Sequence, residues 1–275
     1  MTRVLVTGAT GFVGMQILKA LSKDGINILP VVRSGKEGLV AELPHIEKVI
    51  SSPDIFSETP SWWSKQCRDV DVVVHAAWYA EPTLYLQSPL NINCLSGSLN
   101  LAMGVVNAGV RRFVGVGTCF EYDLSGGILS IDTPLRPTTP YASSKAALFF
   151  TLSQWLPAQA IEFAWCRLFY LYGEGEDERR LAPYLRKKMM KGELAQLTSG
   201  KQIRDFLDVR EAGKRISEIT QGHQVGPINI CSGIPITVRQ FAERIADEYG
   251  QKNLLRFGER ADNLIDPQCV LGIPN

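Results

Sequence analysis

The chain has 275 residues, of which 45% are hydrophobic and 21% charged, and its formal net charge at pH 7 is +1. A chain of this length and composition is expected to be globular and to bury a sizeable core. Its near-neutral charge provides no general electrostatic attraction for nucleic acid or an anionic membrane, so neither is an expected partner.

A short apolar strand within the first seven residues leads into a glycine-rich turn, TGATGFVG at 7–14, and then into a helix with apolar residues at helical spacing. The three glycines would allow a tight turn, close approach of the backbone to a diphosphate, and close packing of the helix on the sheet. The helix N-terminus would then face the anion. We expect a dinucleotide site rather than a glycine turn without a ligand, with contacts from Gly8, Thr10, Gly11, Phe12, Val13 and Gly14.

Short β-branched runs alternate with helical patterns over the first part of the chain. The predicted strands are residues 4–7, 28–32, 49–51, 70–75, 112–117 and 161–168. Strands separated by helices indicate right-handed βαβ units and a parallel sheet covered on both faces. The predicted fold class is therefore α/β, a Rossmann-type doubly wound parallel sheet, in a domain of residues 1–168.

The residues after the second predicted strand are expected to select the cofactor. An acidic side chain here would accept a hydrogen bond from the 2′-hydroxyl of the NAD ribose, but this chain has Arg33, Ser34, Gly35 and Lys36. A guanidinium with a neighbouring hydroxyl suits the additional 2′-phosphate of NADP. We therefore expect NADPH to be preferred, with NAD as the alternative if Arg33 is only a solvated side chain.

Tyr141 and Lys145, in the segment PYASSK, are the predicted catalytic pair, together with Thr118 at the end of a strand. Pro140 suits a helix start, and the four-residue spacing places the tyrosine and the lysine on one face of that helix. A free phenol has a pKa of about 10, which a nearby ammonium can lower by about 1 to 3 units. We expect Tyr141 to protonate a carbonyl oxygen that Thr118 holds, while Lys145 also binds the nicotinamide ribose.

A second tyrosine and lysine at the same spacing, Tyr184 and Lys188, lie in a basic helical segment without a neighbouring strand-end hydroxyl. We expect this pair to be a solvated helix face.

The pattern loosens after residue 168, and residues 169–275 are expected to form a smaller substrate-binding lobe that interleaves with the first domain. The sequence predicts turns at 172–177, a basic helix at 179–192, a hairpin-like region at 195–207, and helices near 210–220 and 238–249.

The motifs GATGFVG, HAA, GTCFEY, YASSK, RLFYLYG and RDFLDVREAG occur in this order. With them the chain resembles an extended short-chain dehydrogenase/reductase of the NAD-dependent epimerase/dehydratase type. The resemblance implies a nucleoside-diphosphate sugar as substrate and a homodimer formed through helices at 84–108 and 141–156. It also implies cofactor contacts from Asp54, Ile55, Ala76 and Ala77. A structural asparagine of the family falls near Asn91 and Asn93, although its usual position is closest to Cys94.

The segment GTCFEY narrows the reaction that the resemblance implies. Family dehydratases place an acid and a base after the threonine, but this chain has Cys119 and Phe120 there. Phenylalanine cannot transfer a proton, and Cys119 is one residue away from the position of the cysteine that related epimerising synthases use. We expect Cys119 to be a packed thiol, with Glu121 left open as a base.

These residues favour an NADPH-dependent reductase of a 4-keto group on a nucleotide-linked 6-deoxy or dideoxy sugar. An NAD-dependent 4-epimerase and a non-catalytic NADP(H)-binding redox sensor are the two alternatives.

Substrate contacts are expected from Trp78, Thr118, Cys119, Phe120, Tyr141 and Arg204. Arg204 matches the family arginine that grips the diphosphate, and a guanidinium fork suits two phosphates. The alternative is a surface arginine paired with Asp205 or Asp208. The tyrosines at 79, 170 and 172 could line the sugar site or belong to the core.

The six cysteines form no CxxC pair, and the three histidines are scattered, so no metal site is expected. The sequence contains neither a long apolar run nor the pattern of a signal peptide. We therefore expect a cytoplasmic protein with reduced thiols.

Overall fold

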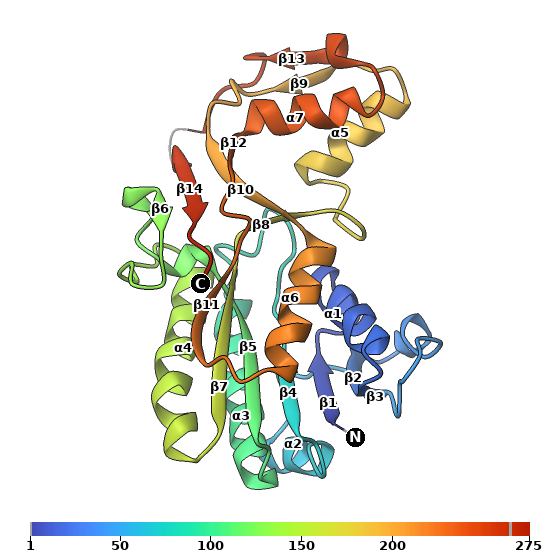
Figure 1. The fold of residues 1–275 in the computed structure, drawn as a ribbon, viewed down its shortest axis with the longest axis vertical. Helices are drawn as coiled ribbons and strands as arrows, with labels where there is room; N and C mark the ends of the chain where they lie inside the picture. Colours follow the sequence, from blue (N-terminus) through green and yellow to red (C-terminus); the bar gives the residue numbers. More distant parts are fainter. Residues whose placement is uncertain (1, 264–265) are drawn as a thin grey trace.

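The computed structural model describes residues 2–263 and 266–275. Its main sheet is parallel, with strand order β11-β7-β5-β4-β1-β2-β3 (Figure 1). These strands are β1 (Arg3–Thr7), β2 (Asn27–Arg33), β3 (Ile50–Ser52), β4 (Val72–His75), β5 (Arg112–Thr118), β7 (Glu162–Leu168) and β11 (Gly226–Ile230). The predicted doubly wound fold is confirmed. The strand β11, which the sequence patterns did not reveal, extends the sheet beyond β7.

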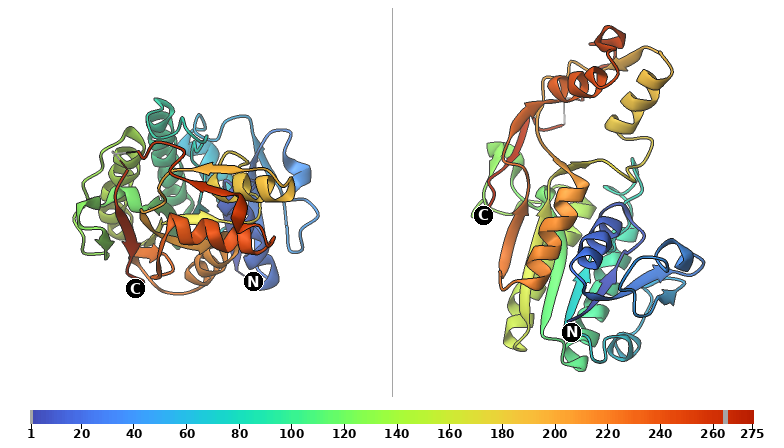
Figure 2. Two further views of the ribbon diagram at one scale, coloured as in Figure 1. Left: turned by 90° about the horizontal axis from the view of Figure 1, so that it is seen from above. Right: turned by 45° about the vertical axis from the view of Figure 1, so that its right-hand side comes forward.

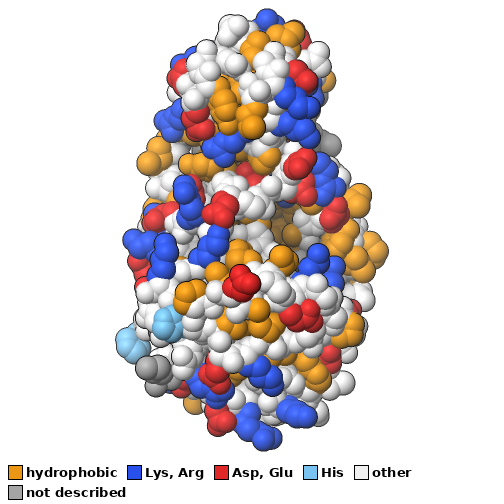
Figure 3. All heavy atoms as spheres, turned by 90° about the vertical axis from the view of Figure 1, so that its right-hand side faces the viewer, with side chains coloured by type: hydrophobic (Ala, Val, Ile, Leu, Met, Phe, Trp, Pro, Cys, Tyr) orange, Lys and Arg blue, Asp and Glu red, His pale blue; other side chains and the backbone are white. Residues whose placement is uncertain are grey.

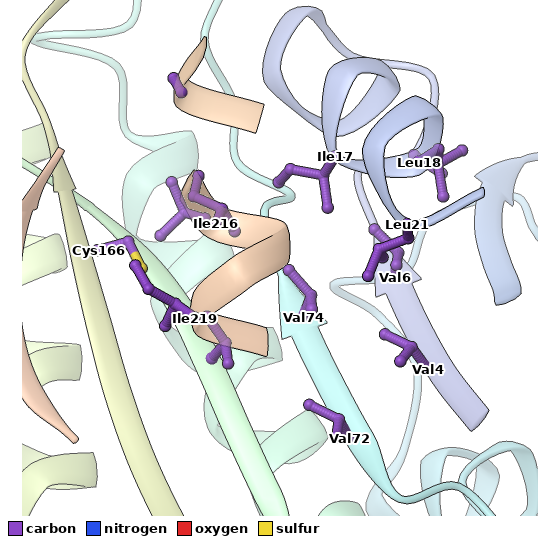
Figure 4. Packing of buried hydrophobic residues seen from close by; sticks show 14 of the residues in the cluster. Val4, Val6, Ile17, Leu18, Leu21, Val72, Val74, Cys166, Ile216 and Ile219 are labelled. Atoms are coloured by element: carbon purple, nitrogen blue, oxygen red, sulfur yellow. The ribbon is translucent and has the colours of Figure 1, made fainter. Parts of the chain in front are cut away.

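Five helices cover the two faces of this sheet. They are α1 (Phe12–Lys23), α2 (Pro60–Gln66), α3 (Leu90–Ala108), α4 (Pro140–Ala158) and α6 (Val209–Gln221). Side chains alternate along each strand, so neighbouring residues enter different cores. Val4, Val6, Val72 and Val74 pack with α1 and α6 (Figure 4), whereas Leu5, Val73, Phe113 and Phe163 pack with α2, α3 and α4.

The second lobe lies beyond the carboxyl ends of the main strands (Figures 1 and 2). One small sheet has the order β12-β10-β14-β6, with β8 also paired to β10, and another consists of β13 and β9. Its strands are β6 (Ile128–Leu129), β8 (Tyr170–Tyr172), β9 (Ala195–Leu197), β10 (Ile203–Asp208), β12 (Pro235–Thr237), β13 (Leu255–Phe257) and β14 (Cys269–Gly272). The helices α5 (Leu181–Met190) and α7 (Val238–Asp247) complete it.

Four short 3-10 turns join these elements. They are η1 (Glu37–Leu39), η2 (Cys119–Glu121), η3 (Leu124–Gly126) and η4 (Lys252–Leu254).

Two sequence-based assignments differ from the structure. The hairpin at 195–207 was wrong, because β9 pairs in parallel with β13 while β10 belongs to the other small sheet. The helix expected from residue 84 begins at Leu90, after a turn that ends with Pro89. The two lobes interleave, since α6 and β11 return to the main sheet and β6 joins the second lobe. Residue 168 therefore ends β7 but does not separate the chain into two spatial units.

Candidate active site

The glycine turn after β1 brings three backbone segments very close together. Gly8 has φ of 69°, and a Cβ atom there would lie 2.7 Å from the amide nitrogen of Ala77. A Cβ atom on Gly14 would lie 2.0 Å from the carbonyl oxygen of Gly8. Side chains at these positions would force the backbone apart, so the turn can keep its shape only with glycine. The exposed N-terminus of α1 is then open to an anion, and the turn fits the diphosphate of a dinucleotide.

A cavity of about 440 Å³ lies over this turn and extends to the carboxyl ends of β4 and β5. The predicted cofactor residues on its wall are Gly8, Thr10, Gly11, Phe12, Val13, Gly14, Arg33, Asp54, Ile55, Ala76, Ala77, Tyr141 and Lys145. Ser34 is not among the lining residues, and its hydroxyl oxygen lies 3.1 Å from that of Ser51. Figure 3 shows one face of the molecule, hollowed between the lobes, with lysine and arginine side chains on both sides of the hollow.

The cavity end at β2 is positively charged. Arg33 and Lys36 line it, and neither forms an ion pair within the part of the chain that the structure describes. The nearby carboxylate of Glu37 accepts a hydrogen bond from Ser51 at 2.6 Å. Asp54 accepts hydrogen bonds from the Phe56 amide at 3.0 Å and the Ser57 hydroxyl at 2.8 Å, so local contacts fix its carboxylate. The sequence patterns did not single out Lys36 as a site residue, although its charge beside Arg33 was visible.

The three predicted catalytic residues lie where β5 ends and α4 begins. Thr118 and Lys145 are buried and Tyr141 is partly exposed. Tyr141 and Lys145 line the cavity, whereas Thr118 does not. Thr118 is the last residue of β5, and Tyr141 and Lys145 lie in the first turns of α4. Thr139 caps this helix by accepting a hydrogen bond from the Ala142 amide at 3.2 Å, as its position before Pro140 favours. The Lys145 ammonium donates to the carbonyl oxygen of Val116 at 2.6 Å. The helix start therefore places both side chains beside the end of β5.

Burial dominates the electrostatics of these groups. It raises the pKa of Tyr141 well above its ordinary value, and a hydrogen bond with the Thr118 hydroxyl only partly opposes this. The predicted lowering of the Tyr141 pKa by the Lys145 ammonium was therefore wrong. Burial also lowers the pKa of Lys145 to about 7, against the opposing effect of the negative charge on Glu121.

Trp78 lies over Lys145, with the ammonium 3.9 Å from the centre of the indole ring. The indole nitrogen donates to Asn91 Oδ1 at 2.8 Å. The Asn91 amide in turn donates to the carbonyl oxygens of Tyr85 at 2.7 Å and Ser88 at 2.9 Å. Asn91 is buried, whereas Asn93 is exposed. Trp78 itself lines the cofactor cavity beside Ala77.

His75 is a scaffold residue that the sequence patterns did not identify. Its Nδ1 lies 2.8 Å from the Thr7 hydroxyl, and its Nε2 lies 2.7 Å from the Ser98 hydroxyl. The Ser98 hydroxyl donates to the Cys94 carbonyl oxygen at 2.6 Å, so it accepts a hydrogen bond from Nε2 of His75. Burial lowers the pKa of His75 to about 3, so the ring is neutral and ties β1 to β4 and α3.

The segment after Thr118 leaves the strand and forms the turn η2. Cys119 packs in an apolar cluster with Tyr122 and Phe169, and burial raises the pKa of its thiol. Phe120 is partly buried and contacts the ring of Tyr170, with ring centres 6.1 Å apart. Both side chains adjoin Thr118 without lining the cofactor cavity.

Arg204 lies in β10 and is only 2% exposed. Its guanidinium pairs with Asp266 at 2.6 Å and lies over the ring of Tyr170. The expected alternative partners were wrong, because Asp205 accepts from Ser232 and Gly233 while Asp208 pairs with Arg210. Arg204 does not line the cofactor cavity.

The second tyrosine and lysine pair is separate from this site. Tyr184 packs against the apolar core of the second lobe, and Lys188 pairs with Glu193 at 2.8 Å. Among the described residues, no group of three or more potential ligands could hold a metal ion. Over the same residues, no helix has the length and apolar character needed to cross a membrane.

Comparisons with known proteins agree with this architecture. A dTDP-6-deoxy-L-talose 4-dehydrogenase (NAD(+)) of Aggregatibacter actinomycetemcomitans is 23% identical over 278 residues, which cover 98% of both chains. A UDP-glucose 4-epimerase of Streptococcus mutans is 26% identical over 274 residues, which cover 90% of this chain and 82% of that protein.

Solved structures show the same fold. A UDP-N-acetylglucosamine 4-epimerase of Methanobrevibacter ruminantium, in complex with UDP-N-acetylmuramic acid, has a TM-score of 0.88 at 23% identity. The similarity covers 100% of this chain and 90% of that chain. The model of the family described as "NAD dependent epimerase/dehydratase family" matches residues 4–231. The chain therefore belongs to the NAD-dependent epimerase/dehydratase family of extended short-chain dehydrogenases/reductases.

Proposed function

We propose that this protein is an NADPH-dependent reductase of the 4-keto group of a nucleoside-diphosphate-linked 6-deoxy or dideoxy sugar. The observation that carries the proposal is the composition of the site. Tyr141 and Lys145 line the cavity, and Thr118 is hydrogen-bonded to Tyr141. The three residues that follow Thr118 offer no free acid or base. Cys119 is buried, Phe120 cannot transfer a proton, and both oxygens of Glu121 accept hydrogen bonds. Hydride transfer with one proton donor needs no further group.

Each residue of the site has a distinct task in this proposal. A reduced nicotinamide, when bound, supplies a hydride to the carbonyl carbon of the sugar. Tyr141 donates its proton to the carbonyl oxygen, because burial keeps the phenol protonated. Thr118 donates a hydrogen bond to the same oxygen and stabilises the developing negative charge. Lys145 holds the ribose of the cofactor and places it beside the tyrosine.

The surroundings of Tyr141 support a sugar that lacks a hydroxyl group at C6. The rings of Tyr85 and Trp78 contact Tyr141 edge-on, with centres 4.8 Å and 6.5 Å away. Phe120, two residues after Thr118, contacts the ring of Tyr170 in β8. An apolar wall favours a methyl group over a hydroxyl group that would lose its hydrogen bonds. The full-length similarity to a 4-dehydrogenase of a dTDP-linked 6-deoxy sugar agrees, since that reaction in reverse is a keto reduction.

Two further assignments belong to the same proposal. Arg33 and Lys36 favour NADPH through its 2′-phosphate, although the name of the similar 4-dehydrogenase specifies NAD(+).

We also propose a cytoplasmic homodimer formed through α3 and α4. Large apolar side chains on these helices are exposed, including Ile92 at 62% and Phe150 at 56%. Phe150→Glu should yield monomers by size exclusion with light scattering, whereas Met190→Glu on α5 should leave the dimer intact.

The decisive experiment is NADPH oxidation by the purified protein with a panel of CDP-, dTDP- and GDP-linked 4-keto-6-deoxy sugars. We expect turnover with one nucleotide series, and a loss of about 10²- to 10⁴-fold in Tyr141→Phe with NADPH binding retained. Turnover that survives in Tyr141→Phe would contradict the proposed proton donor. Silence across the panel with intact NADPH binding would reject the reductase and favour a binding protein such as a redox sensor.

A nucleotide-sugar 4-epimerase is the second candidate. It is favoured by the similarity to the Streptococcus mutans UDP-glucose 4-epimerase and needs the same three catalytic residues. Such an enzyme oxidises and re-reduces one carbon, so its cofactor must stay bound. Cofactor that co-purifies in equal amount and resists washing, with interconversion of 4-epimers without added NADPH, would replace the reductase by this function.

A further inference from the structure

Glu121 is a completely buried carboxylate directly behind the catalytic threonine. Its Oε1 accepts hydrogen bonds from the Thr118 amide at 2.8 Å and from the Trp165 indole nitrogen at 3.1 Å. Its Oε2 accepts from Arg167 Nε at 2.8 Å. Glu121 and Thr118 also form a reciprocal capping box around η2. With its oxygens engaged and no exposure to solvent, Glu121 is not available as the general base that the sequence left open.

The space for this carboxylate depends on a glycine in β5. A Cβ atom on Gly117 would lie 2.4 Å from Glu121 Oε1 and 2.2 Å from the indole nitrogen of Trp165. Any side chain at this position would therefore displace the carboxylate from the strand. The glycine between Val116 and Thr118 thus allows a charged group to lie against the backbone of the catalytic strand.

Two charged side chains hold the end of β5 by hydrogen bonds to backbone groups two residues apart, at Val116 and Thr118. Lys145 donates to the carbonyl oxygen of Val116 at 2.6 Å, while Glu121 accepts from the amide of Thr118. Arg167 partly neutralises Glu121 and is itself fixed by a hydrogen bond to the Tyr122 hydroxyl at 3.0 Å. A buried charge fixed this way interacts strongly with other charges in the same low-dielectric surroundings.

We propose that Glu121 is a positioning residue for the reaction, which fixes the backbone of Thr118 and stabilises the ammonium form of Lys145 with its negative charge. The proposal rests on the proposed function for its kinetic readout. It is supported by the opposing effects on Lys145, whose pKa is lowered by burial and raised by Glu121. Cys94 also faces the lysine from α3, and the neutral His75 faces it from β4.

The test compares the pH dependence of three variants. Glu121→Gln keeps an oxygen for the Thr118 amide but removes the charge, whereas Glu121→Asp keeps the charge but draws the carboxylate back. Glu162→Gln is a matched control, because Glu162 pairs with buried Arg112 at 2.7 Å at the opposite end of β5 and β7. For each, kcat, KM and NADPH affinity are measured across the pH range around neutrality, with thermal unfolding alongside.

In Glu121→Gln the negative charge near Lys145 is gone, so we expect the lysine to lose its proton at a lower pH than in the wild type. The decline of kcat and of NADPH affinity on the alkaline side, called the alkaline limb, should therefore begin about one pH unit lower. Glu121→Asp should reduce kcat by about tenfold with the limb unmoved, and Glu162→Gln should leave both unchanged. An unmoved limb in Glu121→Gln, or an equal shift in Glu162→Gln, would overturn the proposal.

Two further outcomes keep the test decisive. If Glu121→Gln does not fold, Glu121→Asp decides, because wild-type kcat in that variant would refute the positioning of Thr118. If no sugar is reduced by the wild-type protein, the NADPH-affinity limb still tests Glu121, so failure of the proposed function is distinguished from failure of this inference.

Discussion

The guanidinium of Arg204 lies 2.6 Å from the carboxylate of Asp266 and joins β10 to the segment that precedes β14. The same guanidinium lies over Tyr170, whose ring contacts Phe120 next to the catalytic threonine. Asp266 is 41% exposed, whereas Arg204 is almost fully buried. A substrate phosphate could replace this half-exposed carboxylate without further desolvation of the arginine.

Arg204→Gln should therefore raise the KM for the nucleotide sugar by about 10- to 100-fold, which corresponds to the loss of one charged hydrogen bond. NADPH affinity should not change, because Arg204 does not line the cofactor cavity. Asp266→Asn should leave KM equal or lower, since it frees the guanidinium. An unchanged KM in Arg204→Gln would assign the arginine to structure alone.

Cofactor choice should depend on the charge at the end of β2. Arg33→Asp is expected to shift the ratio of NADPH to NADH affinity towards NADH by about tenfold or more, because a carboxylate repels the 2′-phosphate and accepts from a 2′-hydroxyl. Lys36→Ala should shift it in the same direction by less. Arg68→Asp, an exposed position after α2, is the control for net charge. An unchanged ratio in Arg33→Asp would remove this arginine from cofactor selection.

The buried neutral His75 should make the fold sensitive to acid. Its pKa is lowered from 6.5 to about 3, so between these values the unfolded chain binds a proton that the folded chain does not. The free energy of unfolding should thus fall as the pH drops through this window, by up to about 1.4 kcal/mol per pH unit from this residue. His75→Gln should flatten the dependence seen in urea unfolding, and exposed His223→Gln should not. Equal slopes in both variants would contradict the assignment.

The thiol of Cys119 should have no part in proton transfer. Its pKa is raised by burial in an apolar cluster, so no thiolate is available at neutral pH. Cys119→Ala is expected to keep kcat within about twofold of wild type and to lower stability by about 1 kcal/mol through the small cavity it leaves. A loss of activity above tenfold in a stable Cys119→Ala protein would instead identify the thiol as an acid or base.

Local sequence patterns were sufficient to predict the glycine turn, the capped start of α4 and most strands of the main sheet. A tight turn needs glycine at positions such as Gly8, where φ is positive, and a Pro140 helix start fixes the relation between Tyr141 and Lys145. Strand alternation and helix periodicity depend only on neighbours in sequence, so they could be read directly. These features determined the fold class and the candidate catalytic residues.

Only the tertiary structure decided which strands and charged side chains pair, and how burial shifts the pKa of side chains in the site. The partner of β9 is β13, and that of Arg204 is Asp266, both far away in sequence and brought near by the folding of the second lobe. The pKa of Tyr141 rises because residues from several elements exclude water around it. The hydrogen bonds that the Glu121 carboxylate accepts likewise come from Arg167 and Trp165 of β7. Burial is a property of the whole packed chain, so no local pattern contains it.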